Sequence, residues 1–174
     1  VDPMDGTKEF IKQTGEFTVN IALVRLGKPV LGVVYVPAKD LYYWAEQGQG
    51  AFKQQGEEAA FSIKVRSPDK KRPGIVASRD HAGSMVQELL ERFPGAETQS
   101  MGSSLKFCLI AEGKSDIYLR DVPTMEWDTA AAQCVVEQAG GVVQDIGGNR
   151  LGYNKPVLRN PSIITLGEAS FIWR

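Results

Sequence analysis

The first third of the chain alternates apolar and polar residues with a period of two. In residues 17–26 every second residue from Phe17 to Leu23 is apolar, which predicts a β-strand. Gly-Lys-Pro at 27–29 is turn chemistry, and VLGVVYV at 30–36 predicts a second, more buried strand, so the two form a hairpin. Further strands are predicted in 41–52, around a Gly-rich turn, and in 61–65.

The second half alternates short apolar runs with helical spacing. Apolar residues from Val86 to Phe93 recur at i, i+3, i+4 and i+7, which predicts an amphipathic helix. Residues 103–113 predict a second, apolar helix that ends at Gly113. A third helix is predicted at 128–141, capped by Asp128 and stopped by Gly140-Gly141, with short strands at 75–78, 116–120, 142–146 and 162–166. This alternation predicts α/β layers.

A charged, proline-containing segment separates the two halves. SPDKKRPG at 67–74 holds two prolines and four consecutive charges. We therefore predict a first domain at 1–72, the remainder of an α+β unit, and a second α/β domain at 73–174. A solvated loop inside a single domain is the alternative interpretation.

Composition restricts the class of protein more than its chemistry. The 174 residues are 43% hydrophobic and 24% charged, which is typical of a globular chain with a real core. A formal net charge of −1 gives no general attraction to nucleic acid, and no apolar run reaches the length of a membrane span. Cys108 and Cys134 lie in apolar segments, so we predict reduced core thiols and a cytoplasmic location.

The first candidate for chemistry is the opening stretch, VDPMDGTKEF. Asp2 and Asp5 carry like charges three residues apart, and Pro3 and Gly6 favour a bend that turns both carboxylates into one hollow. With the Met4 carbonyl they would form a set of oxygen ligands suited to Mg²⁺. The alternative is an ordinary Asp-rich turn whose side chains bind nearby amides.

The second candidate is Asp128, which precedes a run of small residues. Small residues let another backbone or a ligand come close. Taken alone, Asp128 is best explained as a helix cap favoured by the helix dipole. Taken with the opening stretch, it is a third carboxylate supplied from far along the chain.

The two motifs together carry a resemblance that covers the whole chain. D-P-[IML]-D-G-T at 2–7, W-D-x-A-A at 127–131 and A-G-G at 139–141 resemble the inositol monophosphatase-like superfamily of Mg²⁺-dependent, lithium-sensitive phosphatases. The chain is most similar to the 3'(2'),5'-bisphosphate nucleotidases of the CysQ branch. This similarity rests on Lys8-Glu9-Phe10, GEFTVNIAL (15–23) and GSSLKFCLIAEG (102–113).

The resemblance implies a layered α-β-α-β-α sandwich and a site with two or more Mg²⁺ ions. Asp2, the Met4 carbonyl, Asp5 and Asp128 match the family's metal ligands. Thr7 matches the threonine that orients the attacking water, so Asp5 and Thr7 become the catalytic candidates. Paired divalent ions would hold both the attacking and the leaving oxygen of an in-line displacement.

The resemblance also implies a substrate site. A nucleotide bisphosphate needs cations and N–H donors, and Ser103 and Lys106 are predicted at a helix start, where an anion is favoured. Arg120 offers a planar fork for phosphate oxygens, although both basic residues could equally be surface charges. His81 is an exposed loop residue on sequence alone and a base or phosphate contact by resemblance. The implied substrate-binding residues are Gly6, Thr7, His81, Ser103, Lys106, Arg120 and Asp128.

One departure from the family pattern concerns the start of the chain. Relatives carry a helical segment before the first motif, and that segment supplies a glutamate ligand for the metals. It is absent here, and Glu9 and Glu16 lie downstream of the motif, so neither replaces it. We expect this chain to be part of a longer enzyme and, by itself, to bind metal weakly.

The leading hypothesis is an enzyme that removes the 3'-phosphate of adenosine 3',5'-bisphosphate, giving AMP and phosphate. It would take this small-molecule substrate, with no nucleic acid polymer or integral membrane as partner, and the resemblance is compatible with a homodimer. The alternatives are an inositol phosphate phosphatase of the same superfamily and a non-catalytic remnant that binds without turnover.

Overall fold

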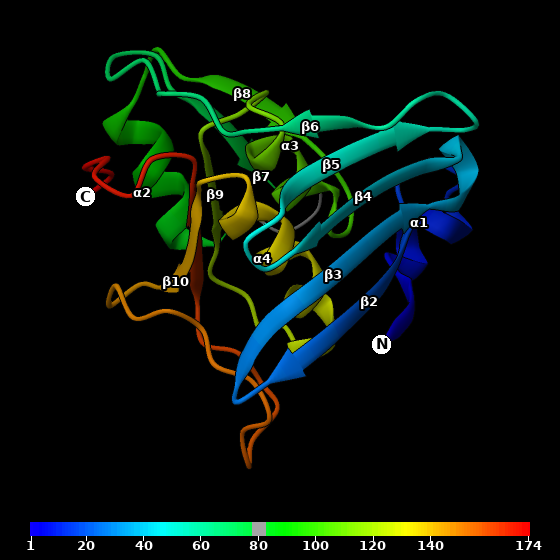
Figure 1. Ribbon diagram of the computed structural model, residues 1–174. Helices are drawn as coiled ribbons and strands as arrows, with labels where there is room; N and C mark the ends of the chain where they lie inside the picture. The colour runs from blue at the N-terminus through cyan, green and yellow to red at the C-terminus, as the bar shows by residue number, and fades with distance from the viewer. Residues whose placement is uncertain (78–82) are drawn as a thin grey trace.

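Two β-sheets form the frame of the molecule, which a computed structural model describes over residues 1–77 and 83–174. The first sheet is antiparallel, with its six strands in sequence order (Figure 1). Its strands are β1 (Asp2–Asp5), β2 (Thr18–Arg25), β3 (Lys28–Val36), β4 (Leu41–Glu46), β5 (Gly50–Gln55) and β6 (Phe61–Ile63). Single-turn connections between β2 and β5 explain why alternation along the sequence was a sufficient signal for this half.

The second sheet is mixed and has the order β10-β11-β9-β7-β8. Strand β7 runs parallel to β8 and β9, and β11 is antiparallel to β9 and β10. The strands are β7 (Gly74–Ala77), β8 (Glu97–Ser100), β9 (Ile117–Arg120), β10 (Val142–Asp145) and β11 (Ile163–Leu166). Parallel pairs require crossover helices, which the second half of the chain supplies.

The helices complete the layers. The helical elements are α1 (Thr7–Ile11), the 3₁₀ turn η1 (Pro37–Lys39), α2 (Ser84–Arg92), α3 (Leu105–Ala111) and α4 (Glu126–Gln138). Helices α3 and α4 lie between the two sheets, and α2 covers the opposite face of the second sheet (Figure 1). The order is sheet, helix pair, sheet, helix, which confirms the predicted α/β layering apart from the first helical layer, absent from the described chain.

Helix α4 packs directly on the backbone of the first sheet. A Cβ atom placed on Gly32 of β3 would lie 2.3 Å from the Ala131 carbonyl oxygen and 2.9 Å from the Cys134 Cβ. Only a glycine therefore leaves room for the helix at this point. The small residues after Asp128 were predicted to let another backbone or a ligand come close. In the structure it is the backbone of this sheet that lies close to them.

The apolar face of β2 is turned away from the helices. Ile21 is 46% exposed and Leu23 is 60% exposed, whereas Thr18 and Asn20 on the opposite face are almost fully buried against α4. The alternation correctly predicted a strand. The buried face nevertheless includes two polar residues, Thr18 and Asn20, which make hydrogen bonds to the candidate site described below.

Most predicted elements are confirmed, with four differences. The hairpin turn lies at Leu26-Gly27, both with positive φ, so Lys28 and Pro29 belong to the strand. Helix α4 begins at Glu126, which places Asp128 in its first turn and not at its cap. Strand β8 was not predicted because its four residues are polar and exposed. Helix α1 was not predicted because it has only five residues and buries none of them.

The predicted ends of two helices and the predicted burial of the two cysteines are confirmed. Gly113 and Gly140 have φ of +71° and +98°, the left-handed geometry expected where α3 and α4 end. Cys108 and Cys134 are free and fully buried, as predicted. The division into domains at residue 72 stays a prediction, since the buried cluster around α3 and α4 draws residues from both sheets. A separate finding concerns membranes: among the described residues, no helix is long and apolar enough to cross one.

Candidate active site

The opening stretch forms the edge strand β1, and an irregularity in its pairing brings two carboxylates to one side. Asp2 pairs with Asn20 and Asp5 pairs with Thr18, so three steps along β1 match two steps along β2. In a regular strand, residues three apart point to opposite faces. The extra residue reverses that alternation, so Asp2 and Asp5 both face α4, together with their partners on β2.

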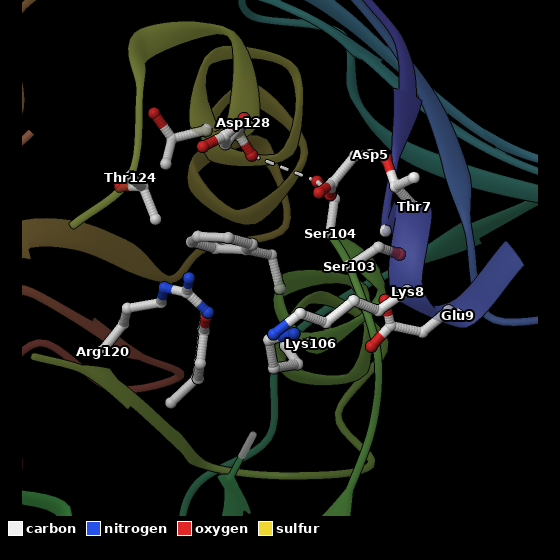
Figure 2. A pocket seen from close by; sticks show the side chains of 14 residues that line it. Asp5, Thr7, Lys8, Glu9, Ser103, Ser104, Lys106, Arg120, Thr124 and Asp128 are labelled. Atoms are coloured by element: carbon white, nitrogen blue, oxygen red, sulfur yellow. Dashed lines mark hydrogen bonds between the residues drawn. The ribbon is translucent and has the colours of Figure 1, made fainter. Parts of the chain in front are cut away.

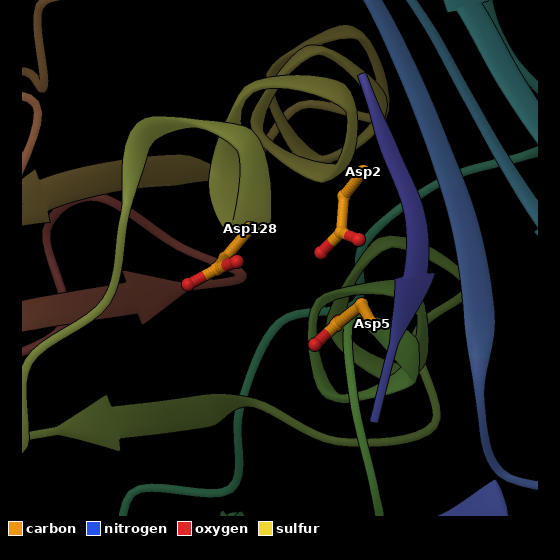
Figure 3. Close-up of side chains that lie close together, drawn as sticks. All are labelled: Asp2, Asp5 and Asp128. Carbon is orange, nitrogen blue, oxygen red and sulfur yellow. The ribbon is translucent and has the colours of Figure 1, made fainter. Parts of the chain in front are cut away.

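Asp128 approaches from the first turn of α4. Its Oδ2 accepts a hydrogen bond from the Met125 N–H at 2.8 Å, so it closes the helix start from inside the first turn. The predicted role as the N-cap residue itself is therefore wrong by three positions. One carboxylate oxygen from each of Asp2, Asp5 and Asp128 lies within 4.8 Å of the others, and the three side chains point into one space (Figure 3).

The electrostatics of this group fit a bound cation. The pKa of Asp128 is raised to about 6, mainly by burial and also by the neighbouring Asp5 and Asp2 carboxylates, against the hydrogen bond from Met125. Burial also raises the pKa of Asp5, opposed by a hydrogen bond from Ser104. Three acidic groups held together at this spacing repel one another unless a positive charge pairs with them. The three carboxylates can hold a divalent metal ion, for which oxygen ligands are the natural set.

Asp5 and Asp128 border a cavity of about 260 Å³ (Figure 2). Its walls come from β1 and α1, from the start of α3, from β9 and from the start of α4. The lining residues are Asp5, Gly6, Thr7, Lys8, Glu9, Ser103, Ser104, Lys106, Phe107, Tyr118, Arg120, Thr124, Asp128 and Thr129. Seven predicted site residues therefore meet in one cavity: Asp5, Gly6, Thr7, Ser103, Lys106, Arg120 and Asp128.

Two cations stand across the cavity from the carboxylates. Lys106 is 4% exposed, and burial lowers its pKa to about 8, opposed by the charge of Asp5. Its Nζ donates to the Met101 carbonyl at 3.2 Å and lies 5.6 Å from the centre of the Tyr118 ring. The Arg120 Nε is buried and has no hydrogen-bond partner. Buried donors of this kind are costly to leave unpaired, so the wall is suited to an anion.

Ser103 is held in a strained conformation beside the same wall. Its φ of +45° lies in the left-handed region, and its buried Oγ has no hydrogen-bond partner. The preceding Gly102 donates its N–H to Glu16 Oε2 at 2.8 Å, and the space for a Gly102 side chain is filled by Glu9. Residues near the chain start thus hold Ser103 in place, with an unused hydroxyl at the cavity.

Ser104 is a site residue that sequence reasoning missed. Its Oγ lies 2.8 Å from Asp5 Oδ2 and 3.1 Å from the Asp128 backbone carbonyl oxygen, and it accepts a hydrogen bond from Asn20 Nδ2 at 3.0 Å. The Gly-Ser-Ser sequence offered two adjacent hydroxyls, but only the three-dimensional structure shows that the second one faces the carboxylates. Lys8, Glu9, Thr124 and Thr129 also line the cavity and were not predicted.

A loop from the chain's last quarter fixes the start of α4. The Glu126 carboxylate accepts hydrogen bonds from the N–H groups of Asn154 and Lys155, at 2.8 and 3.1 Å, and from Lys155 Nζ at 2.6 Å. Asn160 Nδ2 donates to the Met125 carbonyl at 2.9 Å. These bonds fix the turn of helix that carries Asp128.

Three predicted site residues stand apart from the cavity wall. Asp2 belongs to the carboxylate group but does not line the cavity. Met4 is 40% exposed, and its carbonyl as a metal ligand stays a prediction. His81 lies outside the described residues, so its predicted contact with substrate also stays a prediction.

Comparison with curated proteins finds relatives that carry the name CysQ. The "3'(2'),5'-bisphosphate nucleotidase CysQ" of Escherichia coli K12 is 49% identical over 153 residues, covering 88% of this chain and 61% of the relative. The protein of the same name from Haemophilus influenzae is 36% identical over 176 residues, covering 100% of this chain and 65% of the relative. The chain thus spans about three fifths of the length of these relatives.

Solved structures agree with this result. The crystal structure of CysQ from Bacteroides thetaiotaomicron matches with a TM-score of 0.87 and 43% identity, over 95% of this chain and 68% of that one. The Thermotoga maritima IMPase matches with a TM-score of 0.78 and 25% identity, over 97% and 63%. The profile described as "Inositol monophosphatase family" covers residues 1–168. With the fold, the carboxylate group and these relatives in agreement, the chain belongs to the inositol monophosphatase family.

Proposed function

We propose that this chain carries most of the active site of a Mg²⁺-dependent phosphatase that hydrolyses the 3'-phosphate of adenosine 3',5'-bisphosphate. The observation that carries the proposal is the arrangement of charges around one cavity. The carboxylates of Asp5 and Asp128 border one side, and the desolvated Lys106 and Arg120, whose Nε has no hydrogen-bond partner, border another. A substrate with two phosphates satisfies this arrangement better than a substrate with one, because each phosphate has its own set of partners.

Asp2, Asp5, Asp128 and the Met4 carbonyl would hold the cations, which supply Lewis-acid activation of a water molecule and of the phosphoryl oxygens. Thr7, which begins α1 and lines the cavity, would orient the attacking water. The water oxygen forms a bond to the 3'-phosphorus and the bond from phosphorus to the ribose O3' breaks. The ribose oxygen gains a proton, which gives AMP and inorganic phosphate.

Lys106, Arg120 and Ser103 would hold the second phosphate. Lys106 supplies a charge with little water around it, and the Arg120 guanidinium supplies paired N–H donors. The unpaired Ser103 hydroxyl supplies a further donor. Gly6, at the start of α1 with a φ of +89°, lets its backbone approach the ligand closely.

The choice of substrate is supported by the relatives named CysQ, which are nucleotidases acting on 3'(2'),5'-bisphosphates. The alternative is an inositol phosphate, since the family also includes the Thermotoga maritima IMPase. A reducing compartment such as the cytoplasm fits the two buried free thiols, Cys108 and Cys134.

The test is phosphate release by the full-length protein from adenosine 3',5'-bisphosphate and from inositol 1-phosphate, with and without Mg²⁺ and with added Li⁺. We expect faster release from the nucleotide, dependence on Mg²⁺ and inhibition by Li⁺. Faster release from inositol 1-phosphate would replace the proposed substrate by the alternative. If Mg²⁺ stimulates release from neither compound, the proposal is wrong.

A further inference from the structure

The Ser104 hydroxyl lies at the junction of three segments that are far apart in the sequence. It lies 2.8 Å from Asp5 Oδ2 on β1, 99 residues away, and accepts from Asn20 Nδ2 on β2, 84 residues away. It also lies 3.1 Å from the backbone oxygen of Asp128 on α4. Ser104 and Asn20 are 1% and 2% exposed, so water does not compete for these bonds.

The direction of the Ser104 proton follows from its neighbours. A hydroxyl has one hydrogen to donate, and the Asn20 amide donates to its oxygen. The proton must therefore go to Asp5 Oδ2 or to the Asp128 carbonyl. The bond to Asp5 is shorter and has a carboxylate as acceptor, which makes it the stronger of the two. Thr18 Oγ1, at 3.5 Å from the same Asp5 oxygen, adds a weak second contact.

We propose that Ser104, oriented by Asn20, is a positioning residue that fixes the rotamer of Asp5 for cation binding. One Asp5 oxygen is held by the hydroxyl, which directs the other oxygen toward the space shared with Asp2 and Asp128 (Figure 3). Groups that hold a metal ligand in place commonly change metal affinity by about 10–100-fold when removed. This role rests on the proposed function, because it requires the three carboxylates to bind a metal.

The experiment is a titration of the purified full-length protein with Mn²⁺, used as a paramagnetic probe for the Mg²⁺ site and followed by electron paramagnetic resonance. No substrate is present, so a lost substrate contact cannot explain the result. We expect Ser104→Ala to weaken Mn²⁺ binding about tenfold or more. Ser104→Thr, which keeps a hydroxyl, should restore most of the affinity.

The matched control is Ser115→Ala. Ser115 follows the opposite end of α3, is 2% exposed and does not line the cavity. It should leave Mn²⁺ affinity unchanged even if it lowers the urea midpoint as much as Ser104→Ala does. Asn20→Ala provides a second variant if Ser104→Ala does not fold, and it should weaken Mn²⁺ binding in the same direction.

The possible outcomes separate this inference from the proposed function. If the wild type binds Mn²⁺ and Ser104→Ala or Asn20→Ala binds it equally well, the positioning role is wrong and the metal site stands. An equal loss in Ser115→Ala would likewise overturn the positioning role, because the effect would be one of general stability. If the wild type itself does not bind Mn²⁺, both the metal site and the positioning role are wrong.

Discussion

The acidic and basic sides of the cavity differ in how far their charged groups have hydrogen-bond partners within the protein. On the acidic side, Asp5 and Asp128 each have hydrogen bonds, from Ser104 and from the Met125 N–H, while burial first and the neighbouring carboxylates second raise the pKa of both. On the basic side, Arg120 has a buried Nε without a partner, and the cost is desolvation. The first set is positioned to receive a cation, whereas the second presents donors to the cavity that suit an anion.

The difference shows how the two sides depend on a ligand. Carboxylates with fixed rotamers can define the geometry around a metal before substrate arrives. Unpaired donors, in contrast, gain their full value when a phosphate enters and replaces the lost water. Changes on the acidic side should therefore act on metal binding and turnover, and changes on the basic side should act on substrate affinity.

The largest effect should come from Asp5→Asn, which removes charge from the acidic side alone. We expect Mg²⁺-dependent phosphate release to fall by about 10³-fold or more, because the charge-stabilising metal site is lost. The thermal midpoint without metal should stay the same or rise, since burial raises the pKa of the Asp5 carboxyl and neutralising it relieves repulsion. The control is Glu46→Gln, an exposed carboxylate at the end of β4. Undiminished turnover in Asp5→Asn would contradict the site.

The next effect should come from Lys106→Met on the basic side. Loss of one charge-assisted bond to phosphate should raise KM for the bisphosphate about 10–100-fold. Mn²⁺ affinity should not fall. The thermal midpoint should not fall either, because Lys106 is buried and the charged form is disfavoured there. Lys114→Met, at a more exposed lysine, is the control. A loss of Mn²⁺ affinity with unchanged KM would show that the two sides are not separate.

A third change, Gly32→Ala, should displace Asp128 relative to Asp2 and Asp5 without altering any charged residue. The new Cβ would overlap the Ala131 carbonyl oxygen and push α4 away from the sheet that carries Asp2 and Asp5. Overpacking of this kind costs about 1–3 kcal/mol of unfolding free energy, which urea denaturation measures. Mn²⁺ affinity should also fall, by about tenfold. Gly152→Ala, with open space around the new Cβ, should do neither.

The smallest effect should come from Arg120→Lys, which keeps the charge and removes the fork. We expect kcat/KM for the bisphosphate to fall about fivefold, equivalent to about 1 kcal/mol. Arg92→Lys, at the exposed end of α2, is the comparison variant. If kcat/KM falls as much in Arg120→Lys as in Lys106→Met, the shape of the guanidinium matters more than its charge.

The strands and the long helices could be predicted because their signals are local. Alternation in 17–26 and helical spacing from Val86 to Phe93 report the elements directly. What alternation could not report is which face is buried. In β2 the polar Asn20 is inside and the apolar Leu23 is outside, because that choice is made by a helix more than 100 residues further on.

The site residues that belong to recognisable sequence motifs could be predicted. Asp2, Asp5 and Asp128 were found and they converge as expected. Ser104 was not found, because a serine beside another serine gives no local sign of which one meets a carboxylate 99 residues away. The capping role of Asp128 was misplaced since helix starts are set by tertiary contacts, here the bonds from Asn154 and Lys155 to Glu126.

The irregular pairing of β1 has a consequence for reading other sequences. Two acids separated by an odd number of steps in an extended segment cannot cooperate unless the strand gains or loses a residue against its neighbour. Where two acids of one site have this spacing in a strand, the spacing indicates an irregularity in the strand pairing. Deleting one residue between Asp2 and Asp5 would make the pairing of β1 regular and would change the spacing of the two acids. In such motifs the count of residues between the acids is as informative as their identity.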